Sequence, residues 1–477
     1  MILRPRSLIV LILALCTAAL ALFVLESARK DVGITQYDVG PTPVTRYARA
    51  DADGPDVIIA HGFAGSRQMM QAYGLTLARA GYVVHAFDFE GHGRHPLPMS
   101  GDVTVIDGTT RLLMAQTQAV IAALPESPQP VALLGHSMAT DILVRAAAET
   151  PGTGPLVLLS AFSEAITDDS PDNLLLITGM WEPGLREFAL KAAETDAVTR
   201  QTTIAPYADH VSILHSVVGQ RAALDWLDAR YDRTSDTAIP HTGWALLALL
   251  TAIVALSAPL SRLLPAQTVP ANPLPAGRFA IITLLPAALA PLIAVPLDPG
   301  LLPVLVADYL ALHLAIYGAL QLALLRFWKT PLGPVKPLAI AALLIWGLGA
   351  FGLALDRYGA NFIPTPERLW IIAALCLGAI PFMLADALLT YGAPFWQRMS
   401  ARLAFLISLA AAVALDFEGL FFLTMIAPVI LLFYLVFGLM GRFAAHRAGP
   451  ASAGLALGLI LAWALGVSFP MFAAVTS

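Results

Sequence analysis

The chain has few cysteines and few charged residues for its length. Only Cys16 and Cys376 occur among 477 residues, and both lie in apolar stretches, so neither a disulfide framework nor a cysteine-based metal site is available. There is no basic patch, which leaves nucleic-acid binding without support, and a net charge of -5 says little about partners. Charged residues make up 13% and hydrophobic residues 57% of the chain, far from the average soluble protein.

The charged residues are concentrated in one half of the sequence. Residues 31–240 hold most of the acids and bases, whereas the remainder is a series of apolar runs separated by short breaks rich in Pro, Gly and Arg. This contrast predicts an α/β domain followed by an all-α polytopic membrane domain. The domains we predict are an N-terminal anchor at 1–30, an α/β domain at 31–235 and a transmembrane domain of about eight helices at 241–477.

The N-terminus carries two arginines, Arg4 and Arg6, followed by an uncharged run over residues 7–25. A run of about 19 apolar residues is long enough to cross a bilayer. A cleaved signal peptide, with its cleavage site at residues 19–21, is the competing interpretation, but the run is long for such a peptide. We therefore predict an uncleaved anchor helix.

Short apolar strands alternate with amphipathic helices between residues 36 and 230, which indicates a mostly parallel sheet with helices on both faces. The expected strands are 34–39, 44–49, 57–60, 82–87, 131–134, 156–159, 174–178 and 202–205. The expected helices are 68–80, 103–124, 140–149, 184–193 and 211–230.

One apolar strand ends in Gly135-His136-Ser137-Met138-Ala139 and leads directly into a helix. A sharp turn from strand to helix raises a serine hydroxyl out of the sheet and requires small residues around it. Ala139 departs from the Gly-x-Ser-x-Gly pattern but is still small. Ser137 is the candidate nucleophile, and an ordinary turn of small residues is the alternative.

Two further motifs occur earlier in the chain, each directly after an expected strand. His-Gly-Phe-Ala-Gly-Ser at 61–66 follows one strand, and Asp-Phe-Glu-Gly-His-Gly at 88–93 follows the next. Together with the serine turn, they resemble the α/β-hydrolase superfamily over residues 40–230, less than half of the chain. The resemblance implies an α/β-hydrolase fold and a serine hydrolase of the esterase or lipase type.

The resemblance also implies a catalytic triad in the chain order serine, acid, histidine. A serine hydroxyl needs a histidine to remove its proton and an acid to orient that histidine. The turn at 179–183 resembles the Gly-x-x-Asp turn of the family with glutamate in place of aspartate, which makes Glu182 the acid. His210, before the last helix, is the base, and Asp209 beside it is a capping residue. The competing candidates are Asp168, Asp169 and Asp172 for the acid and His215, more than a turn into the last helix, for the base.

The family stabilises the developing oxyanion with two main-chain N–H groups, which here belong to Phe63 and Met138. The expected substrate-binding residues are Met69, Met70 and Trp181, with core packing as the more ordinary role for each. His61 resembles a structural histidine of the family, and His136 is simply the variable residue of the serine turn. Only about a dozen residues follow Ser160 before the next strand, which leaves no room for a large helical lid.

Apolar runs of membrane length repeat to the C-terminus. We expect spans at 243–264, 279–297, 301–325, 337–355, 369–390, 402–415, 419–440 and 451–472, the sixth being short for a crossing. With the N-terminus inside, the loops assigned to the cytoplasm hold nine Lys and Arg residues, and those assigned outside hold only Arg357 and Arg368. The positive-inside rule favours this arrangement, although Arg29 and Lys30 flank the anchor on the outside.

Asp308, His313 and Asp386 are ionisable groups at or within membrane depth, where such groups are costly and indicate a site or pathway. Packing or placement at the interface is the alternative. These three residues are the candidate intramembrane site.

The sequence therefore predicts a membrane-embedded serine hydrolase that cleaves an ester or thioester with an apolar acyl chain. It also predicts an integral protein of the bacterial inner membrane with the catalytic domain facing the periplasm, no cofactor or metal, and a lipid-like substrate. An acyltransferase using the same acyl-enzyme, or a transporter or receptor with a hydrolase-like binding domain, are the alternatives. The oligomeric state is not indicated.

Overall fold

The computed structural model describes residues 5–102, 106–168, 171–194, 199–266, 274–297 and 300–473. Arg4, Asp169 and the first residues of the helix expected from position 103 lie outside these ranges. The chain forms two compact units. The sheet unit consists of Ala19–Leu249, Leu355–Thr365 and Pro470–Ser477, and the helical unit consists of Met1–Ala18, Leu250–Ala354 and Pro366–Phe469.

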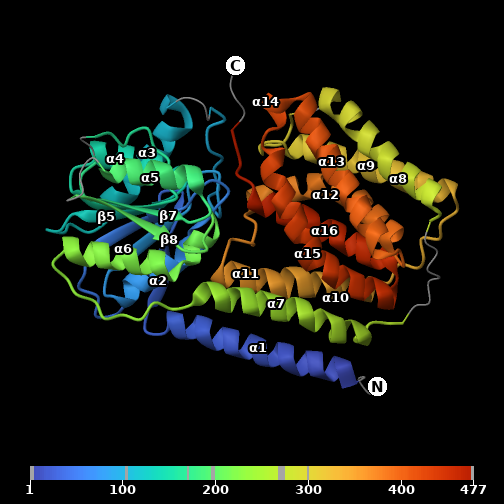
Figure 1. The fold of residues 1–477 in the computed structure, drawn as a ribbon, viewed down its shortest axis with the longest axis horizontal. Helices are drawn as coiled ribbons and strands as arrows, with labels where there is room; N and C mark the ends of the chain where they lie inside the picture. Colours follow the sequence, from blue (N-terminus) through green and yellow to red (C-terminus); the bar gives the residue numbers. More distant parts are fainter. Residues whose placement is uncertain are drawn as a thin grey trace. The chain divides into compact units, whose positions relative to one another are not determined.

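An eight-stranded sheet with the order β1-β2-β4-β3-β5-β6-β7-β8 organises the sheet unit (Figure 1). The first two strands form an antiparallel hairpin, β2 pairs antiparallel with β4, and all other pairs are parallel. The strands are β1 Gly33–Val39, β2 Thr42–Ala48, β3 Asp56–Ala60, β4 Val83–Phe87, β5 Val131–His136, β6 Thr153–Leu159, β7 Leu174–Gly179 and β8 Arg200–Ala205. The predicted mostly parallel α/β sheet is confirmed.

Helices cover both faces of this sheet, which explains why its central strands are apolar throughout. In β3, Val57 and Ile59 belong to one core layer, and Ile58 and Ala60 belong to the other. Figure 1 shows α2 and α6 on one face and α3, α4 and α5 on the opposite face. These helices are α2 Gln71–Arg79, α3 Arg111–Ala122, α4 Met138–Glu149, α5 Pro183–Glu194 and α6 Val217–Arg230.

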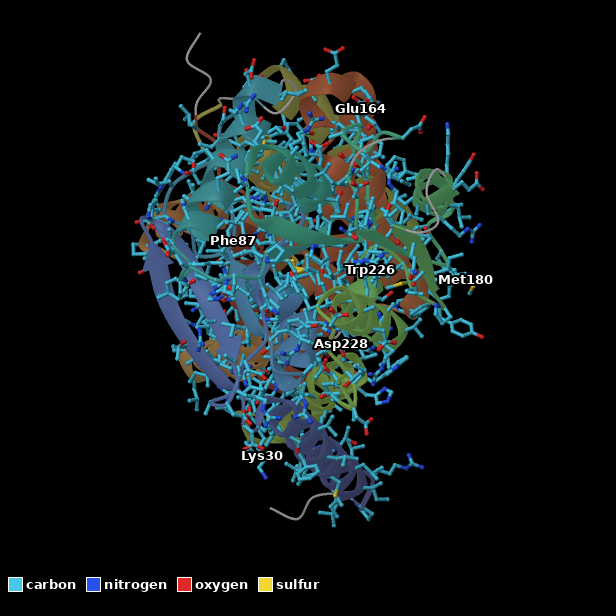
Figure 2. All side chains as sticks on the ribbon, turned by 90° about the vertical axis from the view of Figure 1, so that its left-hand side faces the viewer. Lys30, Phe87, Glu164, Met180, Trp226 and Asp228 are labelled. Atoms are coloured by element: carbon cyan, nitrogen blue, oxygen red, sulfur yellow. The ribbon has the colours of Figure 1, made fainter. Side chains whose placement is uncertain are left out.

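The helix expected over residues 211–230 is interrupted near its start. A short 3-10 turn, η3 (Ser212–His215), comes first, and Ser216 then takes an extended backbone conformation before α6 begins. The Ser216 hydroxyl caps α6 by accepting the N–H of Gly219 at 3.1 Å. His215 therefore ends the 3-10 turn instead of lying inside the helix. Further along α6, Asp228 (Figure 2) accepts a hydrogen bond from the Tyr82 hydroxyl at 2.8 Å.

Two segments from much later in the sequence complete the sheet unit, first Leu355–Thr365 and then Pro470–Ser477. Asp356, in the first of them, binds the guanidinium of Arg94 at 2.6 Å. In the second, the N–H of Met471 donates to the Gly91 carbonyl at 2.8 Å, and the Met471 carbonyl accepts the N–H of Met99 at 3.0 Å. Both segments are therefore attached at the loop that follows β4.

The described residues include nine helices long and apolar enough to cross a membrane, in agreement with the expected one plus eight. These spans are Pro5–Arg29, Thr242–Leu263, Ala276–Leu297, Ala307–Phe327, Pro337–Tyr358, Pro366–Thr390, Phe395–Leu415, Leu423–Ala448 and Pro450–Ser468. In Figure 1 they correspond to α1, α7, α8, α9, α10 with α11, α12, α13, α15 and α16.

The sixth C-terminal span was expected to be short, and this expectation was wrong. The helix α13 (Phe395–Leu415) has 21 residues because it begins before Arg398, which sequence reasoning left outside the span 402–415. Long basic side chains are tolerated at the end of a membrane helix, since their charged groups can reach the polar region. Arg368 was placed in an outer loop but is buried in α12, where it donates to the Gly466 carbonyl at 3.0 Å.

The helices α12 (Pro366–Thr390) and α16 (Pro450–Ser468) are the most buried spans of the helical unit and pack against each other. Gly454 and Gly458 let the two backbones approach closely: a Cβ at position 454 would lie 2.7 Å from the Leu384 Cα. Such spacing of small residues is typical of packed membrane helices.

Candidate active site

Ser137 forms the turn between β5 and α4 and has a strained backbone, with φ 53° and ψ -118°. Close packing maintains this conformation. A Cβ on Gly135 would lie 2.7 Å from Leu143 Cδ1, and a Cβ on Gly62 would lie 2.9 Å from Ser137 Cβ. The fully buried Ala139 fits the same turn. Small residues at these positions therefore allow the turn to raise the Ser137 hydroxyl.

The three side chains expected to form a triad are joined by two consecutive hydrogen bonds. His210 Nε2 is 2.9 Å from Ser137 Oγ, and His210 Nδ1 is 2.7 Å from Glu182 Oε1. They follow β5, β7 and β8, parallel strands whose carboxyl ends meet at one edge of the sheet. This geometry is that of a nucleophile, a base and an acid that orients the base.

The Glu182 carboxylate is held by more than the histidine. Its second oxygen accepts the N–H of Gly179 at 2.7 Å and the hydroxyl of Ser160 at 2.8 Å. Burial raises the pKa of this carboxyl, but the hydrogen bonds from His210, Gly179 and Ser160 outweigh burial and hold the pKa below its ordinary value. Sequence reasoning missed Ser160, although its position directly after an apolar strand placed it at the same edge of the sheet.

Of the competing acids, Asp168 and Asp172 lie in the described ranges, and neither forms a hydrogen bond or ion pair with His210. Asp168 and Asp172 are exposed, and Nδ1 of His210 is bound to Glu182. Asp209 accepts the N–H groups of Val211 at 3.1 Å and Ser212 at 2.8 Å, as expected of a capping residue.

His136 has a partner that the sequence did not indicate. Its Nε2–H donates to the main-chain carbonyl of His210 at 2.8 Å, and the two rings lie 4.9 Å apart. Burial, the largest effect, lowers the pKa of His136 to about 3, so the ring is neutral at neutral pH. His136 is therefore more than a variable residue, because it links the serine turn to the loop that carries His210.

The two expected oxyanion donors come from the serine turn and from the loop after β3. Met138 is the first residue of α4, where the main-chain N–H groups have no partner within the helix. Phe63 follows Gly62, whose backbone lies against Ser137. The loop is fixed by His61, whose Nδ1–H donates to the Gly62 carbonyl at 2.8 Å.

The expected substrate-binding residues differ in position. Met70 is fully buried in the core between the sheet and α2, and Met69 packs against the same core. A side chain in the core is not accessible to a substrate, so Met70 has the packing role and is removed from the candidate pocket. Trp181 is 60% exposed and stays a prediction.

Phe472, near the C-terminus, is a neighbour of the site that sequence reasoning did not identify. Its ring centroid lies 6.4 Å from that of Phe63, and its side chain is buried. No local pattern could have indicated this pairing, because 409 positions separate the two residues in the sequence.

The three candidates for an intramembrane site each have their own partners. Asp308 accepts the N–H of Leu302 at 2.6 Å, as a residue at the start of α9 (Ala307–Phe327). His313 bonds to the hydroxyls of Tyr309 and Ser408, and Asp386 pairs with Arg402 at 3.5 Å. These hydrogen bonds and this ion pair do not join the three residues into one site.

Within the described ranges, no three His, Cys, Asp or Glu side chains gather in a way that could hold a metal ion. The groups that the site offers are a hydroxyl, an imidazole, a carboxylate and main-chain N–H donors. These groups suffice for acyl transfer through a covalent intermediate.

Comparison with known proteins finds a family that part of the sheet unit resembles. Residues 54–236 match the family model described as serine aminopeptidase, S33. A search of curated proteins finds no match.

Many solved structures are similar to this part of the chain at low sequence identity. A predicted CIB-like hydrolase from Thermoplasma acidophilum is 16% identical, with 42% of this chain and 99% of that chain covered and a TM-score of 0.35. A dienelactone hydrolase from Anabaena variabilis is 18% identical, with coverage of 42% and 98% and a TM-score of 0.34. A hormone-sensitive lipase from a metagenome library is 15% identical, with coverage of 48% and 99% and a TM-score of 0.33.

The expected resemblance is confirmed by the matching family model and by the order and direction of the strands. Residues 54–236 form a hydrolase domain that belongs to the α/β-hydrolase superfamily.

Proposed function

We propose that this hydrolase is a membrane-embedded serine enzyme that cleaves an ester or thioester with an apolar acyl chain. The observation that carries the proposal is the line Ser137–His210–Glu182, with separations of 2.9 Å and 2.7 Å. A serine in a strained turn, bonded to a histidine that is bonded to a buried carboxylate, is arranged for nucleophilic attack.

The reaction has two half reactions. His210 Nε2 takes the proton as Ser137 Oγ attacks the acyl carbon, and the N–H groups of Phe63 and Met138 stabilise the oxyanion. His210 then protonates the leaving alcohol or thiol, which departs as the C–O or C–S bond breaks. Water, deprotonated by His210, attacks the acyl-enzyme, and Ser137 regains its proton as the acid is released.

The nature of the substrate is inferred from the surroundings of the triad. Phe63, in the oxyanion loop, and the exposed Trp181, next to Glu182, are apolar, and the buried Phe472 packs against Phe63. The described residues between β6 and β7, 160–168 and 171–173, form no helix, so an apolar acyl chain would enter without a large helical lid there. The nine apolar helices support a site at a membrane, where lipid-like esters are available.

The sheet unit is assembled from three segments of the chain, and the number of spans between these segments supports placing the catalytic domain on one side of a bilayer. Four spans lie between its first and second segments, and four lie between its second and third. An even number of crossings returns a chain to the side it left. Together with the lysines and arginines near the opposite helix ends, this supports an inner-membrane protein whose catalytic domain faces the periplasm.

Labelling with a fluorophosphonate probe tests the nucleophile. The purified full-length chain should be labelled, and Ser137→Ala should not be labelled. Equal labelling of the variant, or no labelling of the wild type, would refute the assignment of Ser137.

A substrate panel tests the bond that is cleaved. We expect turnover of p-nitrophenyl esters that increases with acyl length, and little turnover of aminoacyl p-nitroanilides. The reverse order would indicate a peptidase. Products formed with added alcohols would distinguish acyl transfer from hydrolysis.

A further inference from the structure

A cavity of about 640 Å³ lies in the helical unit, among α12, α13, α15 (Leu423–Ala448) and α16. Its volume is in the range of small-molecule sites. The residues that line it come from the last turns of α12, the first turns of α13 and α16, the stretch 431–446 of α15 and the turn 391–392. The cavity therefore extends from the side of the unit where α12 leads into α13 and α15 leads into α16.

One part of this cavity is strongly basic. Arg398, Arg402 and Arg442 line it, with Asp386 as a single carboxylate. Arg402 pairs with Asp386 at 3.5 Å and stacks on the Tyr434 ring, 4.1 Å from its centroid. Within the described residues, no carboxylate pairs with Arg398 or Arg442. The lining thus carries two positive charges that no carboxylate in the described part of the chain offsets.

The rest of the cavity is apolar and open at the surface of the helices. Leu403, Leu431 and Leu435 line it and are 57%, 54% and 62% exposed. Exposed leucines on helices of membrane length are suited to contact with hydrocarbon chains. The cavity therefore combines a basic end with an apolar, laterally open body.

We propose that this cavity binds an anionic lipid, with its phosphate on Arg398 and Arg442 and an acyl chain along Leu403, Leu431 and Leu435. Arginine forms strong charge-assisted hydrogen bonds to phosphate oxygens. Basic pockets between membrane helices are suited to anionic head groups, whereas a quaternary ammonium group would be repelled by the same arginines. The site is separate from the triad and does not depend on the proposed hydrolytic reaction.

The test measures lipid binding to the full-length chain in neutral detergent by native mass spectrometry. The probes are dioleoyl phosphatidic acid, dioleoyl phosphatidylcholine, oleate and inorganic phosphate. We expect one phosphatidic acid to bind at least about tenfold more tightly than phosphatidylcholine, because phosphatidic acid carries a net negative charge whereas the ammonium group of phosphatidylcholine is repelled by the arginines. Binding of oleate or phosphate as tight as that of phosphatidic acid would overturn the assignment to a lipid phosphate.

Two variants locate the site. Arg398→Gln with Arg442→Gln removes the unpaired charges, and Gly438→Leu fills the cavity without changing charge, since a Cβ at position 438 has its nearest neighbour at 3.5 Å. Both should weaken phosphatidic acid binding about tenfold or more. Size-exclusion chromatography and thermal unfolding check that each variant is folded.

The matched control removes the same number of charges elsewhere. Arg326→Gln with Lys329→Gln changes two exposed basic residues near the end of α9, outside the cavity. It should bind phosphatidic acid as the wild type does. If the control loses as much affinity as the arginine variant, or if folded Gly438→Leu binds normally, the cavity is not the site.

Discussion

The Nε2–H of His136 donates to the main-chain carbonyl of His210 across 2.8 Å. The residue before the candidate nucleophile thus fixes the backbone of the candidate base. This bond joins two turns that follow different strands of the sheet, so it sets the position of the imidazole relative to the serine hydroxyl.

Replacing His136 by Phe should lower kcat for ester hydrolysis about tenfold with little change in KM, because the His210 loop loses a buried hydrogen bond. His136→Gln, whose amide can donate to the same carbonyl, should restore most of the rate. Steady-state kinetics of both variants provide the measurement. Equal kcat in wild type and His136→Phe would show that the bond does not position the base.

The free energy of unfolding should depend on pH through His136. Its folded pKa of about 3 lies below the ordinary value of 6.5, so the unfolded chain binds the extra proton between these two values. The folded state therefore loses stability as pH falls from 6.5 towards 3. In His136→Gln, the slope of unfolding free energy against pH should decrease by about one proton equivalent. Tryptophan fluorescence during unfolding at several pH values measures this slope, and identical slopes would contradict the prediction.

Changing Glu182 to Gln should reduce kcat by about a thousandfold or more, because a neutral amide does not stabilise the imidazolium of His210. Ser160→Ala removes one of the hydrogen bonds to the carboxylate and should cost about tenfold. Kinetics of both variants test this order. A larger loss of kcat in Ser160→Ala than in Glu182→Gln would show that Glu182 is not the acid.

Gly62→Ala should lower kcat about a hundredfold, because the new Cβ would press against His136 and Ser137 and displace the loop that carries the Phe63 N–H. Gly184→Ala is the matched control, since a Cβ there meets nothing within 4 Å. Both variants are compared by kcat and by fluorophosphonate labelling rate. A control as slow as Gly62→Ala would argue against the steric explanation.

Phe472→Ala should raise KM for long-chain esters several-fold and leave short-chain esters nearly unchanged, because the Phe63 side chain loses the buried ring that packs against it. Phe327→Ala, at an exposed phenylalanine of the helical unit, serves as the control. KM values over a series of acyl lengths provide the test. A change that is independent of acyl length would show that Phe472 has no role in selecting the acyl chain.

Much of the fold could be predicted because its determinants are local. The serine turn requires small residues at positions 135 and 139, and a sheet covered on both faces requires continuous apolar strands such as 57–60, so both patterns are visible in the sequence. Hydropathy alone likewise gave the number of membrane-length helices. The start of α13 was missed because an arginine near a helix end resembles a loop when only charge is considered.

The side-chain contacts of the site were decided by the tertiary structure. Ser160 reaches Glu182, and His136 reaches His210, only because parallel strands far apart in sequence end at the same edge of the sheet. Met70, which the sequence allowed as a pocket residue, lies in the core at the end of a short 3-10 helix, Arg67–Met70. The sequence by itself determined which segments become strands and membrane-length helices, since periodicity and hydropathy act over a few residues. Only the tertiary structure decided which polar groups meet, since a hydrogen bond depends on distances that local patterns do not contain.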